Sequence, residues 1–347
     1  MTALADAALD TSDVPEEYCA ALTRAAVKAE LYRTDPYFRH GAFRTDVGDA
    51  LATTFVVAKP DAVAGRRIPP VLEFLDENGF AVVAAARFRF TPLLTREVWR
   101  YQFNIASWAR AEVVDLLLPA GDSLLLILRD TLPATLPATK RGPLPAACRL
   151  AALKGAADPR SRRGDNLRTR LGGPTTLFNF VHTADEPADV VRELALLELA
   201  TGAPLIATAR RTGPVPDAEL SAAVQALHDA CPAHDLDARA SLRRLAACPD
   251  ERVARLARRA LDGDPSAGWS ALLDLFPGRT PPAPLLWDVL SVATGQIESN
   301  VPGLAPQIPT VAAHTWLDDP GETPTARRRE EGRGVVTARS GGEEEAS

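Results

Sequence analysis

The feature that most constrains the fold is a series of four short apolar runs, separated by helical segments, between residues 53 and 199. The runs lie at 53–58, 80–90, 123–128 and 177–181. β-Branched and aromatic residues are frequent in them, as is typical of strands. Helical patterns follow the first run at 69–78 and the last run at 187–199. This order predicts an α+β fold, a ferredoxin-like antiparallel sheet with helices on one face.

The length of the chain favours more than one domain, because 347 residues exceed what one ordinary core needs. We expect a helical appendage over 1–50, the sheet domain over 51–200 and an all-α domain over 201–317. Residues 318–347 are rich in Gly, Arg and Glu, a composition typical of a disordered tail.

Charge and hydropathy exclude several kinds of partner. The net charge of −6 gives no general attraction to nucleic acid or to an anionic membrane surface. The most apolar stretch, 113–128, is interrupted by Asp115, Pro119 and Asp122, so we expect no membrane span. The four cysteines are scattered without paired spacing, which favours a reducing cytoplasm.

Lysine is rare in this chain, which uses arginine for most of its cations. Among 39 basic residues, the only lysines are Lys28, Lys59, Lys140 and Lys154. A retained lysine therefore indicates a place where a compact ammonium group is needed.

The run at 177–182 delivers a histidine to the end of a predicted strand. Residues 183–187 then form a loop-to-helix signal, with an acidic cap and a proline in the first turn. The following helix places Glu193 on a face that can look back at His182. A carboxylate that accepts the proton of one ring nitrogen leaves the other nitrogen free as a nucleophile. The alternative is an ordinary half-buried histidine near a carboxylate on a helix surface.

Four segments carry short motifs in a fixed order. Phe55–Val63 contains a strand followed by Lys-Pro-Asp, and Leu153–Pro159 contains a glycine four residues before a proline. Asn166–Gly172 contains Leu-Arg before a glycine, and an Asn-x-x-His motif at 179–182 precedes Glu193. In this order, these segments resemble the nucleoside diphosphate kinase family and its divergent branches.

The resemblance implies phosphoryl transfer through a phosphohistidine. His182 would take the γ-phosphoryl group of ATP and pass it to a nucleoside diphosphate, while Glu193 holds its ring and tautomer. Lys59 would meet the phosphates and the ribose, Arg168 would clamp the phosphates, and Asn179 would bind the ribose 3′-hydroxyl. Mg²⁺ would arrive with the nucleotide rather than on protein ligands. The implied partners are nucleoside di- and triphosphates, together with further copies of the chain in a homo-oligomer.

The chain departs from the family at several positions. The family's threonine before the proline is Ala157, and its arginine in the preceding helix is Ala151, with Arg149 nearby as a substitute. Loss of phosphate ligands lowers transition-state binding and hence the rate. Candidates for the aromatic residues that bracket the base are Trp99, Tyr101 and Trp108. Alternatives to Arg168 in the same loop are Arg160, Arg162, Arg163 and Arg170.

Two other functions fit the same residues. A catalytically degenerate domain could bind nucleotide without turnover and act as a scaffold for the helical half, as the missing threonine and arginine favour. Alternatively, a kinase-like enzyme could be retuned to a specialised metabolite, because the long loops over 131–176 and the added domain can reshape the acceptor pocket.

The helical half carries weaker signals. Residues 250–261 resemble one helix of a HEAT-type repeat, but a single copy does not make an array. A zinc site could be assembled from His228, Cys231, His234 and Cys248. Pro232 interrupts that set and no paired-cysteine knuckle is present, so we do not favour zinc binding.

Overall fold

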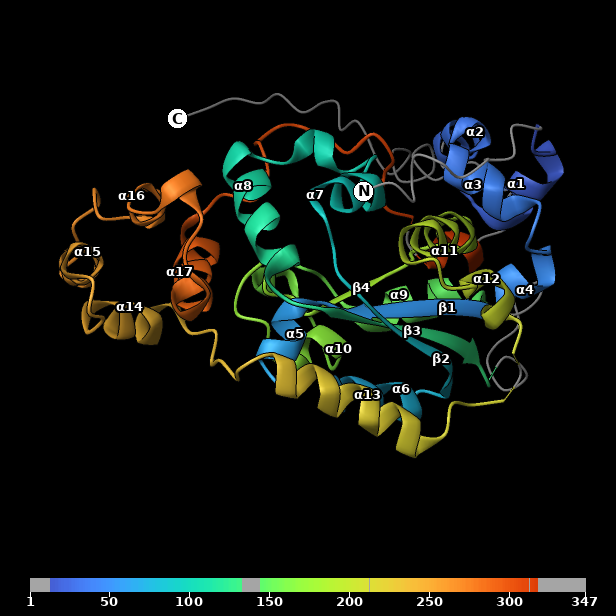
Figure 1. The fold of residues 1–347 in the computed structure, drawn as a ribbon. Helices are drawn as coiled ribbons and strands as arrows, with labels where there is room; N and C mark the ends of the chain where they lie inside the picture. Colours follow the sequence, from blue (N-terminus) through green and yellow to red (C-terminus); the bar gives the residue numbers. More distant parts are fainter. Residues whose placement is uncertain (1–12, 133–143, 212, 312, 318–347) are drawn as a thin grey trace, which may run out of the picture.

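The computed structural model describes residues 13–132, 144–211, 213–311 and 313–317. Within them, four strands form one antiparallel sheet in the order β2-β3-β1-β4 (Figure 1). The strands are β1 Thr53–Ala58, β2 Phe80–Phe88, β3 Ser123–Asp130 and β4 Val181–Thr183. This order confirms the predicted α+β class and the ferredoxin-like sheet. The tail predicted over 318–347 lies outside the described residues, as does Lys140.

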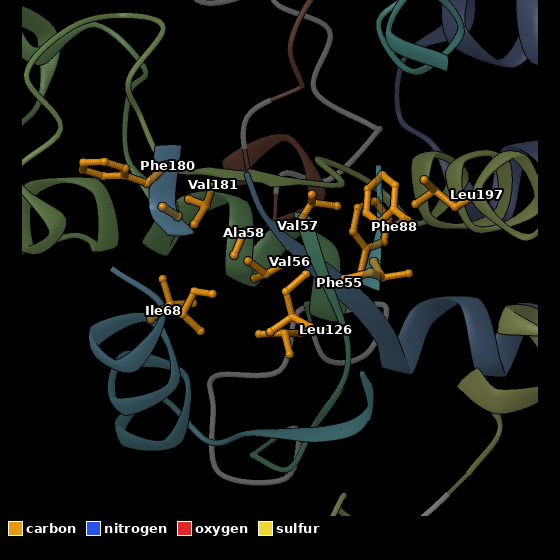
Figure 2. Packing of buried hydrophobic residues seen from close by; sticks show 14 of the residues in the cluster. Phe55, Val56, Val57, Ala58, Ile68, Phe88, Leu126, Phe180, Val181 and Leu197 are labelled. Carbon is orange, nitrogen blue, oxygen red and sulfur yellow. The ribbon is translucent and has the colours of Figure 1, made fainter. Parts of the chain in front are cut away.

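Strand β1 lies at the centre of the domain, and all six of its residues are buried. Successive residues of a strand face opposite sides of a sheet, so a strand buried along its whole length is covered on both sides. Figure 2 shows Ile68 of α6 (Ile68–Glu77) on one side of β1 and Leu197 of α11 (Pro187–Thr201) on the other. The prediction of helices on one face only is therefore wrong.

The N-terminal helices pack against α11. They are α1 Glu16–Leu22, α2 Ala26–Thr34, α3 Pro36–Ala42 and α4 Val47–Ala52. Apolar residues at helical spacing predict one helix across residues 16–31. The structure breaks it in two, because the Thr23 hydroxyl and the Arg24 N–H donate to the Glu186 carboxylate at 2.7 and 2.8 Å. On α11, the fully buried Arg192 donates to Asp35 at 2.8 Å, which fixes the appendage to the sheet domain.

Between β2 and β4 the chain forms several short helices in addition to β3. They are α7 Pro92–Val98, η1 Phe103–Ile105, α8 Trp108–Leu117, η2 Leu118–Ala120, α9 Ala146–Lys154, η3 Pro159–Ser161 and α10 Leu167–Leu171. A short α5, Pro60–Ala64, follows β1 directly. The sequence pattern over residues 94–118 predicts one helix with aromatic inserts. The structure interrupts it, because the Thr91 and Ser107 side chains cap two separate helices.

The helices after α11 divide between two places. Helix α12, Leu205–Ala209, and helix α13, Asp217–Ala230, pack against β2. The next four pack around a core of their own, and Figure 1 shows them grouped away from the sheet. They are α14 Ala238–Ala246, α15 Glu251–Leu261, α16 Trp269–Asp274 and α17 Ala283–Gln296, with η4 Pro277–Arg279 between the last two. The chain then returns to the sheet domain and ends its described part in α18, His314–Leu317.

Two further findings concern the described residues only. None of their helices has the length and apolar character needed to span a membrane. They also contain no group of three or more metal-binding side chains, and His234 is hydrogen-bonded to Asp288 at 2.9 Å instead. The domain boundaries proposed from the sequence stay a prediction.

Candidate active site

A cavity of about 350 Å³ lies at the end of the sheet where β1 and β4 meet the segments around α7 and α8. Its size is in the range of small-molecule sites. Five of the six predicted site residues line it, namely His182, Glu193, Lys59, Arg168 and Asn179. These residues come from positions far apart in the sequence, so the fold assembles a single site from the motifs.

His182 sits in the middle of β4, opposite Val57 of β1. Its Nε2 lies 2.6 Å from Oε2 of Glu193 on α11. The ring of Trp99 packs edge-on against the imidazole, with 5.0 Å between the ring centroids. A carboxylate can only accept a hydrogen bond, so Nε2 carries the proton and Nδ1 is the nitrogen left free.

The fourth strand is shorter and later than predicted, at 181–183 rather than 177–181. Phe180 has a positive φ of 67°, which an L-residue adopts only when its surroundings hold it there. Its N–H donates to the Asp61 carboxylate at 2.9 Å, and its carbonyl accepts the Lys59 N–H at 2.9 Å. The Lys-Pro-Asp segment thus fixes the bend, and sheet pairing begins only at Val181. His182 consequently lies within the strand rather than beyond its end.

Two buried cations lie in the cavity wall. The Lys59 ammonium donates to the Leu177 carbonyl at 2.8 Å and lies 3.5 Å from Asp61. Burial lowers the pKa of Lys59, Asp61 opposes this, and the positive charge of Arg168 lowers it further. The Arg168 guanidinium donates to the carbonyls of Gly155 and Val181 at 3.0 and 2.8 Å.

The Arg168 side chain has only neutral hydrogen-bond partners among the described residues, although it is just 8 % exposed. Burial lowers its pKa to about 10. Its Nε is buried and has no partner within the described residues. A buried charge in such surroundings is costly until an anion approaches it, so this wall of the cavity favours a negatively charged ligand.

Asn179 presents an unused acceptor to the same cavity. Its side-chain nitrogen donates to the Thr176 carbonyl at 2.7 Å. Its Oδ1 is buried and lacks a hydrogen-bond partner in the part of the chain that the structure describes. Because an unpaired buried acceptor is costly, this oxygen is suited to a hydroxyl donor on a ligand.

Arg149 is the one predicted site residue that lies elsewhere, so its assignment as a phosphate ligand is corrected. Its guanidinium binds both carboxylate oxygens of Asp130 at 2.6 and 2.7 Å and the Asn78 carbonyl at 2.8 Å. It also stacks on Phe80, and it does not line the cavity. Ala157 does line the cavity, without a hydroxyl to offer. Neither Arg149 nor Ala157 therefore offers this cavity a phosphate ligand through its side chain.

The sequence motifs missed several residues of the cavity. Lys28, Lys154 and Arg110 all line it. The described part of the chain has three lysines, Lys28, Lys59 and Lys154, and all three face this one cavity. The rarity of lysine was therefore the signal that could have found Lys28 and Lys154, and it gives no signal for Arg110. Of the proposed aromatic residues Trp99 lines the cavity, whereas Tyr101 and Trp108 do not, and Phe103 was not considered.

The added lysines are held by carboxylates. Lys154 lies 2.9 Å from Asp185, and Lys28 lies 2.8 Å from both Glu186 and Asp189. Burial raises the pKa of Asp185, but the charges of Lys154 and Lys28 hold it below the usual range. These ion pairs lie beside His182, between the cavity and the N-terminal helices.

Replacement of Lys28 by methionine is expected to lower the free energy of unfolding by about 3–5 kcal/mol, because two buried carboxylates lose their cation. Burial lowers the pKa of Lys28, but Asp189 and Glu186 raise it above the usual range. The stabilisation is thus complete below about pH 10 and is lost as the pH rises through the folded-state pKa. Urea unfolding of the wild-type protein and Lys28→Met, at pH 7 and above pH 10, measures this stabilisation.

Lys154→Met is the matched control for this prediction, because the side chain of its partner Asp185 is 34 % exposed. We expect a smaller loss there, since water can solvate the remaining carboxylate. Equal losses in the two variants, or a Lys28→Met loss that does not shrink at high pH, would contradict the assignment.

Comparisons with known proteins add a likeness of fold. No family model and no curated protein matches the chain. Among solved structures, nucleoside diphosphate kinase from Encephalitozoon cuniculi is 18 % identical, over 49 % of this chain and 98 % of that one, with a TM-score of 0.35. The enzyme from Aquifex aeolicus is 21 % identical, over 42 % and 94 % of the two chains, with a TM-score of 0.33.

A nucleoside diphosphate kinase family protein from Babesia bovis is 20 % identical, over 42 % of this chain and 86 % of that one, with a TM-score of 0.34. Likenesses with TM-scores this low carry no argument about this chain. What the cavity does is argued below from its own residues.

Proposed function

We propose that this protein transfers the γ-phosphoryl group of a nucleoside triphosphate to a nucleoside diphosphate, through a phosphohistidine at His182. One observation carries the proposal: an imidazole whose Nε2 is held by Glu193 at 2.6 Å lies in a cavity walled by buried cations. The free Nδ1 is a nucleophile, and the cations favour the charge of a polyphosphate.

The reaction then has two steps. In the first, the Nδ1 lone pair attacks the γ-phosphorus, a P–N bond forms, and the bond to the β-phosphate oxygen breaks. The nucleoside diphosphate leaves with that electron pair. In the second, a β-phosphate oxygen of another diphosphate attacks the phosphohistidine, the P–N bond breaks, and Nδ1 recovers its lone pair. Throughout, Glu193 accepts the Nε2–H bond and stabilises the positive charge that grows on the ring.

The surrounding residues bind and orient the nucleotide. Lys59 and Arg168 neutralise phosphate oxygens, and Asn179 Oδ1 accepts a hydrogen bond from a ribose hydroxyl. When bound to the triphosphate, Mg²⁺ would neutralise further phosphate charge. A homo-oligomer and a cytoplasmic location stay predictions.

The test is an exchange assay on the purified protein. Mixed with Mg-ATP and GDP, it should form GTP and ADP, because the phosphohistidine is the same whichever nucleotide donated the phosphoryl group. A second candidate, a degenerate nucleotide-binding scaffold, is favoured by Ala157 in the cavity wall. It predicts that calorimetry detects nucleotide binding while no GTP forms. A panel of other acceptors with ATP tests for a specialised metabolite.

A further inference from the structure

The cavity has a wall that comes from the far end of the chain. After α17, residues 298–311, here named the strap, run back along the connection between α7 and α8. The Val301 N–H donates to the Ile105 carbonyl at 2.8 Å, and the Gln307 N–H donates to the Tyr101 carbonyl at 3.1 Å. The strap is therefore hydrogen-bonded to a segment that lines the cavity.

Two apolar side chains anchor this part of the chain. Ile308 is 3 % exposed and packs in the cluster that includes Tyr101 and Val191. Beyond the strap, Trp316 is buried, and its indole N–H donates to Glu186 at 2.9 Å. The strap residues that line the cavity are Pro306, Ile308, Pro309 and Thr310. The site thus includes a wall that lies outside the part of the chain that resembles the kinases.

The strap also holds a cation of the cavity. Arg110, on the first turn of α8, donates from Nη1 to Oδ1 of Asn300 at 2.6 Å. Its guanidinium lies 5.6 Å from the centre of the Phe103 ring. Its Nε is buried without a partner in the described residues, and no carboxylate there pairs with it. Arg110 is thus a positive charge whose neighbours are an amide and an aromatic ring.

Arg110 belongs electrostatically to the same cluster as the predicted phosphate ligands. Burial is the main cause that lowers the pKa of Lys59, and the charges of Arg168 and Arg110 both lower it further. Lys59 also has its own carboxylate, Asp61, at 3.5 Å. Arg168 and Arg110 have none within the described ranges, so they are the two cations of the cavity most in need of an anion.

We propose that Arg110 is a further phosphate-binding residue of this site and that Asn300 of the strap positions it. The inference rests on the proposed function, because it names an additional ligand for the same polyphosphate. A planar guanidinium fits phosphate oxygens in a bidentate manner, which suits it to the charge of a polyphosphate. The helical half of the chain then has a role in the active site, since it delivers the strap.

The experiment measures binding of tripolyphosphate by calorimetry, which probes phosphate recognition without a base or a ribose. Arg110→Met should weaken binding by about tenfold to a hundredfold, the worth of a charge-assisted hydrogen bond, and Arg110→Lys should recover part of it. Arg96→Met is the matched control. Arg96 also stacks on Phe103 and pairs with Asp115, but it does not line the cavity.

The role of Asn300 is tested in the same assay. Asn300→Ala should weaken tripolyphosphate binding in the wild-type background and change it little in the Arg110→Met background, since a positioning residue acts only through its partner. A purely structural role would lower affinity equally in both backgrounds.

The outcomes separate this inference from the proposed function. Wild-type protein that binds tripolyphosphate, with Arg110→Met binding it as tightly, overturns the inference and leaves the phosphohistidine proposal standing. Wild-type protein that binds neither tripolyphosphate nor Mg-ADP overturns both.

Discussion

Replacement of His182 by alanine is expected to abolish phosphoryl transfer and to leave nucleotide binding in place. The nucleophile is lost, and the loss of a covalent nucleophile lowers kcat by about 10⁴-fold or more. Binding persists because the cations Lys59 and Arg168 come from other segments, and because the acceptor Asn179, three residues before His182, is unchanged. The GTP-forming exchange assay gives the rate, and calorimetry with Mg-ADP gives the affinity.

Two further variants test whether the effect of His182→Ala comes from loss of the imidazole itself rather than from a change in packing. His182→Gln keeps most of the side-chain volume and can still donate to Glu193. Loss of activity in this variant therefore cannot come from an empty space left by a smaller side chain. His228→Ala removes a histidine of α13 that does not line the cavity, and it should leave the rate unchanged. Wild-type rates in His182→Ala would overturn the mechanism.

Replacement of Lys59 by methionine is expected to lower kcat/KM by about 10²–10³-fold, the usual effect of removing one group that stabilises transition-state charge. The ammonium is buried beside Asp61, so the rigid wall holds it in place before the nucleotide binds. Lys59→Arg should not restore activity, because a guanidinium is larger and has a different shape from the compact ammonium. Steady-state rates with Mg-ATP as the varied substrate measure the effect.

The control for Lys59→Met addresses the carboxylate that it leaves behind. Asp61 is fully buried and accepts the Phe180 N–H at 2.9 Å, so the single variant leaves a charge without its cation. In the double variant Lys59→Met with Asp61→Asn that charge is absent. If activity returns in the double variant, the single loss came from the unpaired carboxylate, and Lys59 does not bind phosphate.

The sequence was sufficient for the parts of the fold that local pattern determines. The first strand, 53–58, forms where predicted, because a continuous run of buried residues fits only a strand covered on both sides. The spacing of His182 and Glu193 anticipated a contact that the structure places at 2.6 Å. A strand residue and a helix face eleven positions later can meet with little help from the rest of the chain.

The parts that were missed depend on long-range contacts. The bend at Phe180 is held by the Asp61 carboxylate, 119 positions away, so periodicity near residue 180 could not reveal it. The break at Thr23 depends on Glu186, 163 positions away. The strap carries no periodic pattern, and the hydrogen bond that Arg110 donates to Asn300 joins residues 190 positions apart. Lys28 and Lys154 were visible only as members of a rare residue type.

The most direct test is to identify the phosphorylated residue. Protein incubated with Mg-ATP, without an acceptor, is digested under alkaline conditions and examined by mass spectrometry. The expected result is one phosphoryl group on His182, labile to acid, stable to alkali, and removed when ADP is added. A phosphoryl group on another residue, or an unmodified protein that has bound Mg-ATP, would contradict a phosphohistidine mechanism.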